Sequence, residues 1–148
     1  MKFIVDEMLG RLAKWMRIIG LDTLYFKSIS DYKLSHLAFT EDRFIVTKDS
    51  HLPAKTKAPM LVLAKDLYGE QLKGLLRALK LSIDESKVFS RCLECNTPLV
   101  PIEKNSVRRK VPPYVYKTKK DFLRCPDCGK IFWRATHYAN TLKKLKEL

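Results

Sequence analysis

Short apolar runs alternate with amphipathic segments over the first ninety residues. Residues 3–5, 24–26, 44–47 and 60–64 are runs of mostly apolar side chains with the length of buried strands. Between them, apolar positions recur at helical spacing over residues 9–19, 30–38 and 68–79. Gly20 follows the first helical segment as a C-cap, and Ser30 with Asp31 caps the second. The predicted order is β-α-β-α-β-loop-β-α.

This order predicts the fold class of the N-terminal part. Apolar strands that alternate with helices belong in a parallel sheet that is covered on both faces and joined by right-handed crossovers. We therefore expect an α/β protein with three layers, α/β/α, and a mainly parallel sheet. The character of the chain changes at Phe89, so we expect one domain over residues 1–89 and a second, smaller module over residues 90–148.

Acidic residues stand at the ends of the predicted strands. Asp6, Asp49 and Asp66 come after strands, and Asp31 begins the helix after another strand. Ligands of open parallel sheets bind beyond the carboxyl ends of the strands. We expect Asp6, Asp31 and Asp49 to be catalytic and, with Asp66, to hold Mg²⁺ or Mn²⁺, hard ions that activate water for phosphodiester hydrolysis. The alternative is that these aspartates only cap helices and make turns.

All four cysteines lie in two Cys-x-x-Cys pairs. Cys92 and Cys95 form the first pair, and Cys125 and Cys128 form the second. Two such pairs supply the four thiolates of a closed tetrahedral site, of which zinc is the commonest occupant and iron an alternative. Disulfides are the other alternative, but a chain without an export signal is expected to keep its thiols reduced. We expect a structural zinc site that allows a small module to fold.

Positive charge is concentrated in the C-terminal part. Residues 1–90 hold 15 basic and 11 acidic side chains, whereas residues 91–148 hold 14 basic and 5 acidic ones. Such an excess attracts the phosphates of nucleic acids, and exposed aromatic rings stack on unpaired bases. The alternatives are a solvated lysine-rich surface and, for Trp133, a place in the core of the small module. The residues expected to bind RNA are Arg11, Lys14, Lys48, Arg108, Arg109, Lys110, Lys117, Lys119, Lys120, Trp133, Arg134 and His137.

Composition excludes several other classes of protein. Hydrophobic residues make up 46% of the 148 residues, which is enough for a core and argues against intrinsic disorder. The apolar runs are far shorter than the roughly 20 residues of a membrane span, and the N-terminus lacks the pattern of a secretory signal. We therefore expect a cytoplasmic protein without a membrane partner. The strand ends carry no Gly-rich phosphate loop, dinucleotide fingerprint or nucleophile elbow.

The chain resembles the Mut-seven C-terminal RNase family. The resemblance is carried by residues 5–23, by the turn at residues 47–49, and by residues 91–96 and 125–129 with Trp133 and His137. It implies a PIN-like nuclease domain followed by a zinc ribbon, with acidic residues that bind Mg²⁺ or Mn²⁺ to cleave RNA. Family members carry Gly where this chain has Ala135, and PIN nucleases carry a fourth carboxylate on a helix, for which Asp66 and Glu70 are the candidates.

Two functions follow from these expectations. In the first, the protein is a metal-dependent endoribonuclease whose basic zinc ribbon holds the RNA. A similar two-part plan in the Nob-type ribosomal-RNA endonucleases suggests structured ribosomal or transfer RNA as the substrate. In the second, it is a non-catalytic module that binds RNA or associates with the ribosome. Protein partners cannot be predicted from the sequence.

Overall fold

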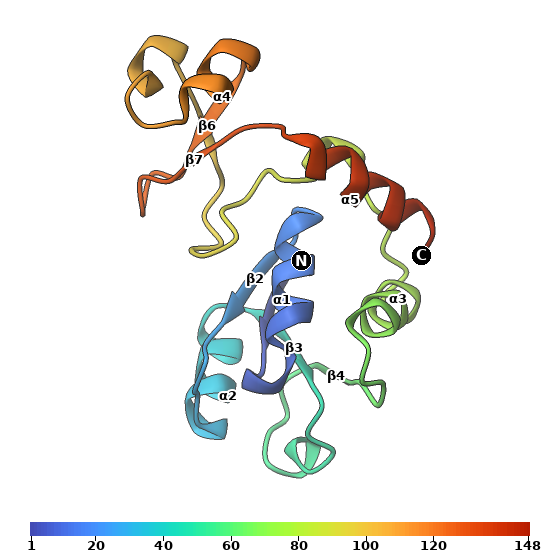
Figure 1. Cartoon of the computed structure of the whole chain (residues 1–148). Coiled ribbons are helices and arrows are strands. Elements are labelled where there is room, and N and C mark those ends of the chain that lie inside the picture. Colours follow the sequence, from blue (N-terminus) through green and yellow to red (C-terminus); the bar gives the residue numbers. More distant parts are fainter. The chain divides into compact units, whose positions relative to one another are not determined.

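The computed structural model describes residues 1–148, which divide into two compact units, Met1–Phe89 and Ser90–Leu148. The N-terminal unit is an α/β fold and the C-terminal unit contains a small antiparallel sheet (Figure 1). The elements of the N-terminal unit are β1 (Lys2–Val5), α1 (Gly10–Ile18), β2 (Asp22–Tyr25), α2 (Asp31–Thr40), β3 (Arg43–Thr47), β4 (Met60–Val62) and α3 (Tyr68–Ala78). The expected order of strands and helices is confirmed, although β2 begins two residues earlier and β4 ends two residues earlier than expected.

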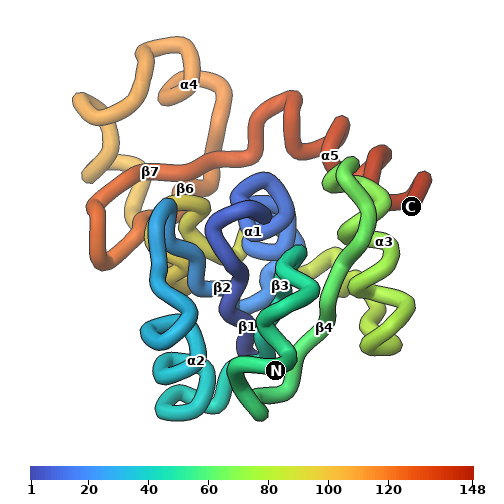
Figure 2. The backbone as a smooth tube through the Cα atoms, turned by 90° about the horizontal axis from the view of Figure 1, so that it is seen from below, coloured from blue at the N-terminus to red at the C-terminus, as the bar shows by residue number.

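The four strands of the N-terminal unit form one parallel sheet in the order β2-β1-β3-β4. Helix α2 covers one face, where Ile4 and Ile45 pack with Leu34. Successive strand residues point to opposite faces, so the fully buried Phe3 and Val46 belong to the other face, where α1 contacts α3. Figure 2 shows the strands in this order with α1 and α2 on opposite sides. The α/β class with a parallel sheet between helices is confirmed.

A glycine with a positive φ closes the C-terminal end of helix α1. The N–H of Gly20 donates to the carbonyl of Arg17 at 3.0 Å, and the N–H of Leu21 donates to that of Met16 at 2.9 Å. Gly20 has a φ of +86°, and a Cβ atom there would lie 2.6 Å from the backbone oxygen of Lys87. Helix C-termini often close in this way with a left-handed residue. Glycine is thus needed both for its backbone angle and for its missing side chain.

The C-terminal unit is built around a three-stranded antiparallel sheet in the order β5-β6-β7. Its core joins Val107, Val111 and Phe122, against which Trp133 packs. Its helices and strands are β5 (Val100–Ile102), α4 (Pro113–Thr118), β6 (Phe122–Arg124), β7 (Ile131–Phe132) and α5 (Thr136–Lys146). None of the helices in the chain combines the length and the apolar character that crossing a bilayer would need.

Candidate functional site

Asp6 is buried where β1 ends, and three protein donors hold its carboxylate. One oxygen, Oδ1, accepts a hydrogen bond from the backbone N–H of Met8 at 2.9 Å and so caps the short 3₁₀ helix Glu7–Leu9. The other, Oδ2, accepts from the hydroxyl of Thr47 and from the backbone N–H of Lys48 at 3.0 Å. Both oxygens of the Asp6 carboxylate are thus held by donors of the protein. The carboxylate is therefore fixed in direction at the carboxyl edge of the sheet.

Thr47 joins Asp6 to Asp49. Its side chain is completely buried at the end of β3, beside β1. The Thr47 hydroxyl donates to Asp6 and accepts from the backbone N–H of Asp49 at 2.9 Å. The Oδ1 atom of Asp49 in turn accepts from the backbone N–H of His51 at 2.8 Å. One hydroxyl thus fixes the turn after β3 next to the buried carboxylate that follows β1.

Two lysines pair with the other expected carboxylates. Asp31, the first residue of α2, accepts from the ammonium of Lys55 at 2.6 Å. This hydrogen bond and the charge of Asp31 raise the pKa of Lys55, and the charge of Asp49 acts in the same direction. The ammonium of Lys48 donates to the exposed Asp66, which lowers the pKa of that carboxyl group. The Asp31 and Asp66 carboxylates are therefore neutralised by lysines of the same unit.

The structure brings the expected aspartates to the carboxyl edge of the sheet without making them one compact cluster. Asp6 and Asp49 share Thr47 as a partner, whereas Asp31 and Asp66 are tied to lysines. No three acidic side chains of the structure bring their carboxylate oxygens close enough together to form a ready-made metal site. Thr47 is a residue of this edge that was not expected from the sequence to have a role. A polar residue at the end of an apolar strand, directly before Lys-Asp, is the signal that could have singled it out.

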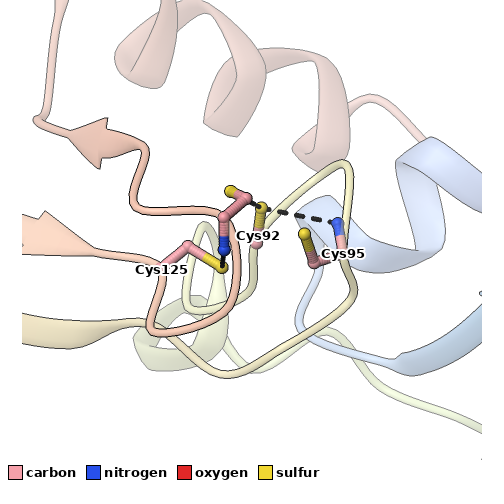
Figure 3. A group of neighbouring side chains, drawn as sticks. Cys92, Cys95 and Cys125 are labelled. Carbon is pink, nitrogen blue, oxygen red and sulfur yellow. Dashed lines mark hydrogen bonds between the residues drawn. The ribbon is translucent and has the colours of Figure 1, made fainter.

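The four cysteines gather into a group that can hold a zinc ion. The sulfur atoms of Cys92, Cys95, Cys125 and Cys128 all lie within 4.8 Å of one another, and those of Cys92 and Cys128 are 3.8 Å apart. Zn–S bonds of about 2.3 Å in a tetrahedron place sulfur atoms about 3.8 Å apart. Figure 3 shows the side chains of Cys92, Cys95 and Cys125 close to one another. The four cysteines therefore fit zinc in both number and spacing, as a zinc ribbon requires.

The backbone of the two cysteine pairs follows one pattern. The N–H of Cys95 points to the sulfur of Cys92, and the N–H of Cys128 points to that of Cys125, each at 3.5 Å (Figure 3). The residue after each pair, Asn96 or Gly129, has a positive φ of 67° or 75°. Asn and Gly are the residues that adopt this conformation most readily. The two turns thus present their thiols in equivalent ways.

The proton affinities of the thiols also suit a cation. A hydrogen bond with Cys128, together with burial, raises the pKa of Cys95 to about 12. Burial opposes the ionisation of Cys125, but hydrogen bonds from the backbone N–H groups of Cys128 and Asp127 lower its pKa to about 7. The Cys125 thiol therefore loses its proton more readily than usual, whereas the raised pKa values of Cys92 and Cys95 oppose the ionisation of those two thiols. A bound divalent cation overcomes this opposition, because metal ligation favours thiolates.

The residues expected to bind RNA lie in both units. In the N-terminal unit, Arg11 and Lys14 are exposed on α1, and the guanidinium of Arg11 lies 4.9 Å from the ring centre of Tyr68. Lys48 pairs with Asp66. Between residues 108 and 120 of the C-terminal unit, Lys119 is half-buried and the other five expected basic residues are exposed. The exposed five are Arg108, Arg109, Lys110, Lys117 and Lys120.

Three expected contacts of the C-terminal unit surround the start of α5. Trp133 is half-buried and packs against Phe122 with ring centres 6.4 Å apart, so this ring belongs to the small core of the unit. Arg134 is exposed, and its guanidinium lies 4.7 Å from the ring centre of Tyr138. His137 is exposed in the first turn of α5. The exposed guanidinium of Arg134 has the geometry of a cation–aromatic contact.

The fold and the two groups of side chains define an α/β protein with carboxylates at one sheet edge and a four-cysteine metal-binding unit. The model of the Mut7-C RNAse domain matches residues 1–145, and the chain belongs to this family. Membership indicates a nuclease or other RNA-related role, with RNA as the substrate. Neither the curated proteins nor the solved structures contain a match to the chain.

Proposed function

We propose that the protein is a metal-dependent endoribonuclease with a PIN-like domain, whose reaction takes place at the carboxyl edge of the N-terminal sheet. The observation that carries this proposal is the link from Asp6 through Thr47 to Asp49. It fixes two acidic residues at the ends of the adjacent parallel strands β1 and β3. Ligands of such sheets bind beyond this edge.

Asp6 and Asp49 fit a hard divalent cation. Mg²⁺ binds through only one or two carboxylates, keeps several waters and completes its shell with substrate phosphates. The Oδ2 atom of Asp49 accepts no hydrogen bond. The Oδ1 atom of Asp6 has one protein donor and keeps a lone pair for a ligand, whereas its Oδ2 atom already accepts two hydrogen bonds. When bound, Mg²⁺ or Mn²⁺ would lower the pKa of a water molecule and stabilise the leaving oxygen. Asp6 and Asp49 would hold the ion, with Asp31 as the candidate for a third ligand.

The two lysines at this edge serve the same reaction by binding phosphate. Lys48 and Lys55 are paired with Asp66 and Asp31, and exposed ion pairs of this kind contribute little stability. An incoming phosphate group therefore competes easily for either ammonium. If a phosphate group binds Lys55, Asp31 loses its ion pair, and its carboxylate becomes available to the metal ion. In this proposal the main role of Asp66 is to pair with Lys48, and not to bind the metal.

The basic surface of the C-terminal unit holds the RNA in this proposal. The exposed run of Arg108, Arg109 and Lys110 follows the buried Val107, and Lys117 with Lys120 adds to the charge. Contacts of this kind are electrostatic and independent of sequence, since they bind phosphates. The four-cysteine site stabilises the unit that carries these residues. Structured ribosomal or transfer RNA is the substrate class we propose.

A second function is favoured by a different observation. Asp31 and Asp66 pair with lysines, and the aspartates form no compact group of three. A chain whose acidic residues only cap, turn and neutralise lysines would bind RNA without cleaving it. The protein would then be a non-catalytic module that binds RNA or associates with the ribosome.

One experiment separates the two functions. A mixture of structured and single-stranded RNA is incubated with Mn²⁺, with Mg²⁺ and without added metal, for the wild type, Asp6→Asn and Asp42→Asn. Asp42 is exposed, lies before β3 and has a φ of 53°, which asparagine also accepts, so this variant is a matched control. Metal-dependent cleavage that Asp6→Asn abolishes and Asp42→Asn retains supports the nuclease. Tight RNA binding by all three proteins without cleavage supports the binding module.

A further inference from the structure

Two aromatic rings and a guanidinium group form a contact between α1 and α3. Arg11 and Trp15 are four residues apart on α1 and therefore share one face of the helix. Tyr68, the first residue of α3, meets both of them. Its ring stacks on Trp15 with ring centres 5.5 Å apart and an interplanar angle of 16°, and the Arg11 guanidinium lies 4.9 Å from its ring centre. Tyr68 thus fixes the position of an exposed cation.

Arg11 differs from Lys48 and Lys55, the two paired lysines at this edge of the sheet, in having no acidic partner. Lys48 and Lys55 are paired with Asp66 and Asp31, whereas the side chain of Arg11 makes only the contact with Tyr68. A guanidinium that stacks on a ring keeps its N–H groups in the plane, directed away from the ring. Two of these groups can bind one phosphate in a bidentate manner. The charge of Arg11 is available to an anionic ligand.

The contact between Arg11 and Tyr68 lies at the same edge of the sheet as the expected aspartates. Helix α1 begins four residues after Asp6, and α3 begins two residues after Asp66. Because β1 and β4 are parallel members of one sheet, both helices begin at the same edge. Arg11 lies in the first turn of α1 and Tyr68 in the first turn of α3. The Arg11–Tyr68 pair therefore lies at the carboxyl edge of the sheet, where Asp6 and Asp49 follow their strands.

We infer that Tyr68 is a positioning residue that holds Arg11 for a phosphate of the RNA bound at this edge. The inference rests on the proposed function, because it assigns the phosphate to the substrate of the Asp6 and Asp49 site. Tyr68 restricts the otherwise flexible arginine before the RNA arrives, so less rotamer entropy is lost on binding. Trp15 supports the Tyr68 ring from the neighbouring turn of α1.

The test measures RNA affinity in the Asp49→Asn background, which prevents cleavage during the titration. A short fluorescein-labelled single-stranded RNA is titrated at several salt concentrations, and the affinity follows from fluorescence anisotropy. We expect Arg11→Ala to weaken binding about tenfold and to reduce the salt slope by about 0.7, as the loss of one phosphate contact requires. Arg77→Ala is the matched control, because Arg77 is exposed in the last turn of α3, at the opposite end from Tyr68.

Substitutions of Tyr68 separate positioning from packing. We expect Tyr68→Leu to weaken binding about threefold, and Tyr68→Phe, which keeps the ring, to bind as the parent does. Tyr68→Leu combined with Arg11→Ala should bind no more weakly than Arg11→Ala alone, because Tyr68 acts through the arginine. Arg11→Lys keeps the charge but loses the planar guanidinium group with its two parallel N–H donors, so it should also bind more weakly than the parent. Thermal unfolding of each variant shows whether the fold is kept.

Three outcomes would overturn the inference. These are an unchanged affinity and salt slope in Arg11→Ala, an affinity of Arg11→Lys equal to that of the parent, and an additive loss in the double variant. If RNA cleavage by the wild type persists in these cases, the proposed function stands and only the role of Tyr68 is wrong. If the wild type neither binds nor cleaves RNA, both are wrong.

Discussion

A single buried hydroxyl organises the carboxylate edge. Thr47 donates to Asp6 and accepts from the N–H of Asp49, so two acidic residues from different strands depend on one side chain. The sequence identified Asp6 and Asp49 as candidates because each follows an apolar strand. It could not show that Lys55 pairs with Asp31 across 24 residues of chain, since such a pairing depends on the path of the loop between them.

Removal of the Thr47 hydroxyl should disturb both stability and the site. We expect Thr47→Val to lower the free energy of unfolding by about 1–3 kcal/mol, because a buried carboxylate and an N–H group lose a partner. Denaturant unfolding measures the change. Thr47→Ser keeps the hydroxyl and should avoid most of this loss. Equal stability of Thr47→Val and the wild type would show that the hydroxyl does not hold Asp6.

The pair of Lys48 and Asp66 predicts a pH effect. The ammonium lowers the pKa of Asp66, so the pair contributes to stability above the ordinary pKa of a carboxyl group, and this contribution is lost as the pH falls through the lowered pKa. We expect Lys48→Met to raise the pKa of Asp66 toward its ordinary value. NMR titration of the Asp66 carboxyl carbon measures this shift. Lys57→Met is the control, because Lys57 is exposed and pairs with no acidic residue. Equal Asp66 pKa values in the two variants would contradict the pairing.

Most elements could be predicted because local pattern and tertiary packing agree. Strands β1 and β4 are nearly continuous apolar runs, and α1 and α3 carry apolar residues at helical spacing, so burial reinforces the local preference. The segment between the cysteine pairs was interpreted as a basic and aromatic surface. In the structure it also contains α4 and packs Val107 and Val111 into a core. Two valines among many basic residues are too weak a pattern to predict that this segment contributes to a hydrophobic core.

The ends of α1 and α3 predict opposite effects of two substitutions. Both helices end in the same backbone motif, with Gly20 at a φ of 86° in one and Lys80 at a φ of 52° in the other. We expect Gly20→Ala to destabilise the protein by about 1–2 kcal/mol from the backbone angle, and further through the close approach to Lys87. Lys80→Gly should stabilise it by up to about 1 kcal/mol. Thermal or denaturant unfolding tests both, and a stabilising Gly20→Ala would contradict the account.

The whole molecule combines two units with different sources of stability. The N-terminal unit has a large apolar core on both faces of its sheet, while the C-terminal unit has only a small core and the four cysteines. Small modules of this kind commonly need a metal to fold. The spacing of the cysteines predicted their grouping, because each Cys-x-x-Cys turn brings two thiols together by itself. The place of Trp133 in the core was left open by the sequence, since an aromatic residue near basic ones suits a core as well as a surface.

Loss of the metal should unfold the C-terminal unit selectively. We expect one zinc ion per chain by elemental analysis. Chelation or Cys125→Ser should remove the dispersed NMR signals of residues 90–148 and retain those of residues 1–89. Ser106→Ala, on an exposed residue of the same unit, serves as the control for the cysteine substitution and should leave both sets of signals in place. A metal-free protein with an unchanged spectrum would contradict a structural role for the site.

The central claim is that Asp6 and Asp49 form a nuclease site at the carboxyl edge of the sheet. The most direct test is the single-turnover cleavage rate of one labelled RNA with Mn²⁺, measured for the wild type and Asp49→Asn together with the RNA affinity of each. We expect Asp49→Asn to lose about 100-fold or more in rate, while its affinity for RNA stays equal or rises because one negative charge is removed. Cleavage by Asp49→Asn at the rate of the wild type would contradict the account.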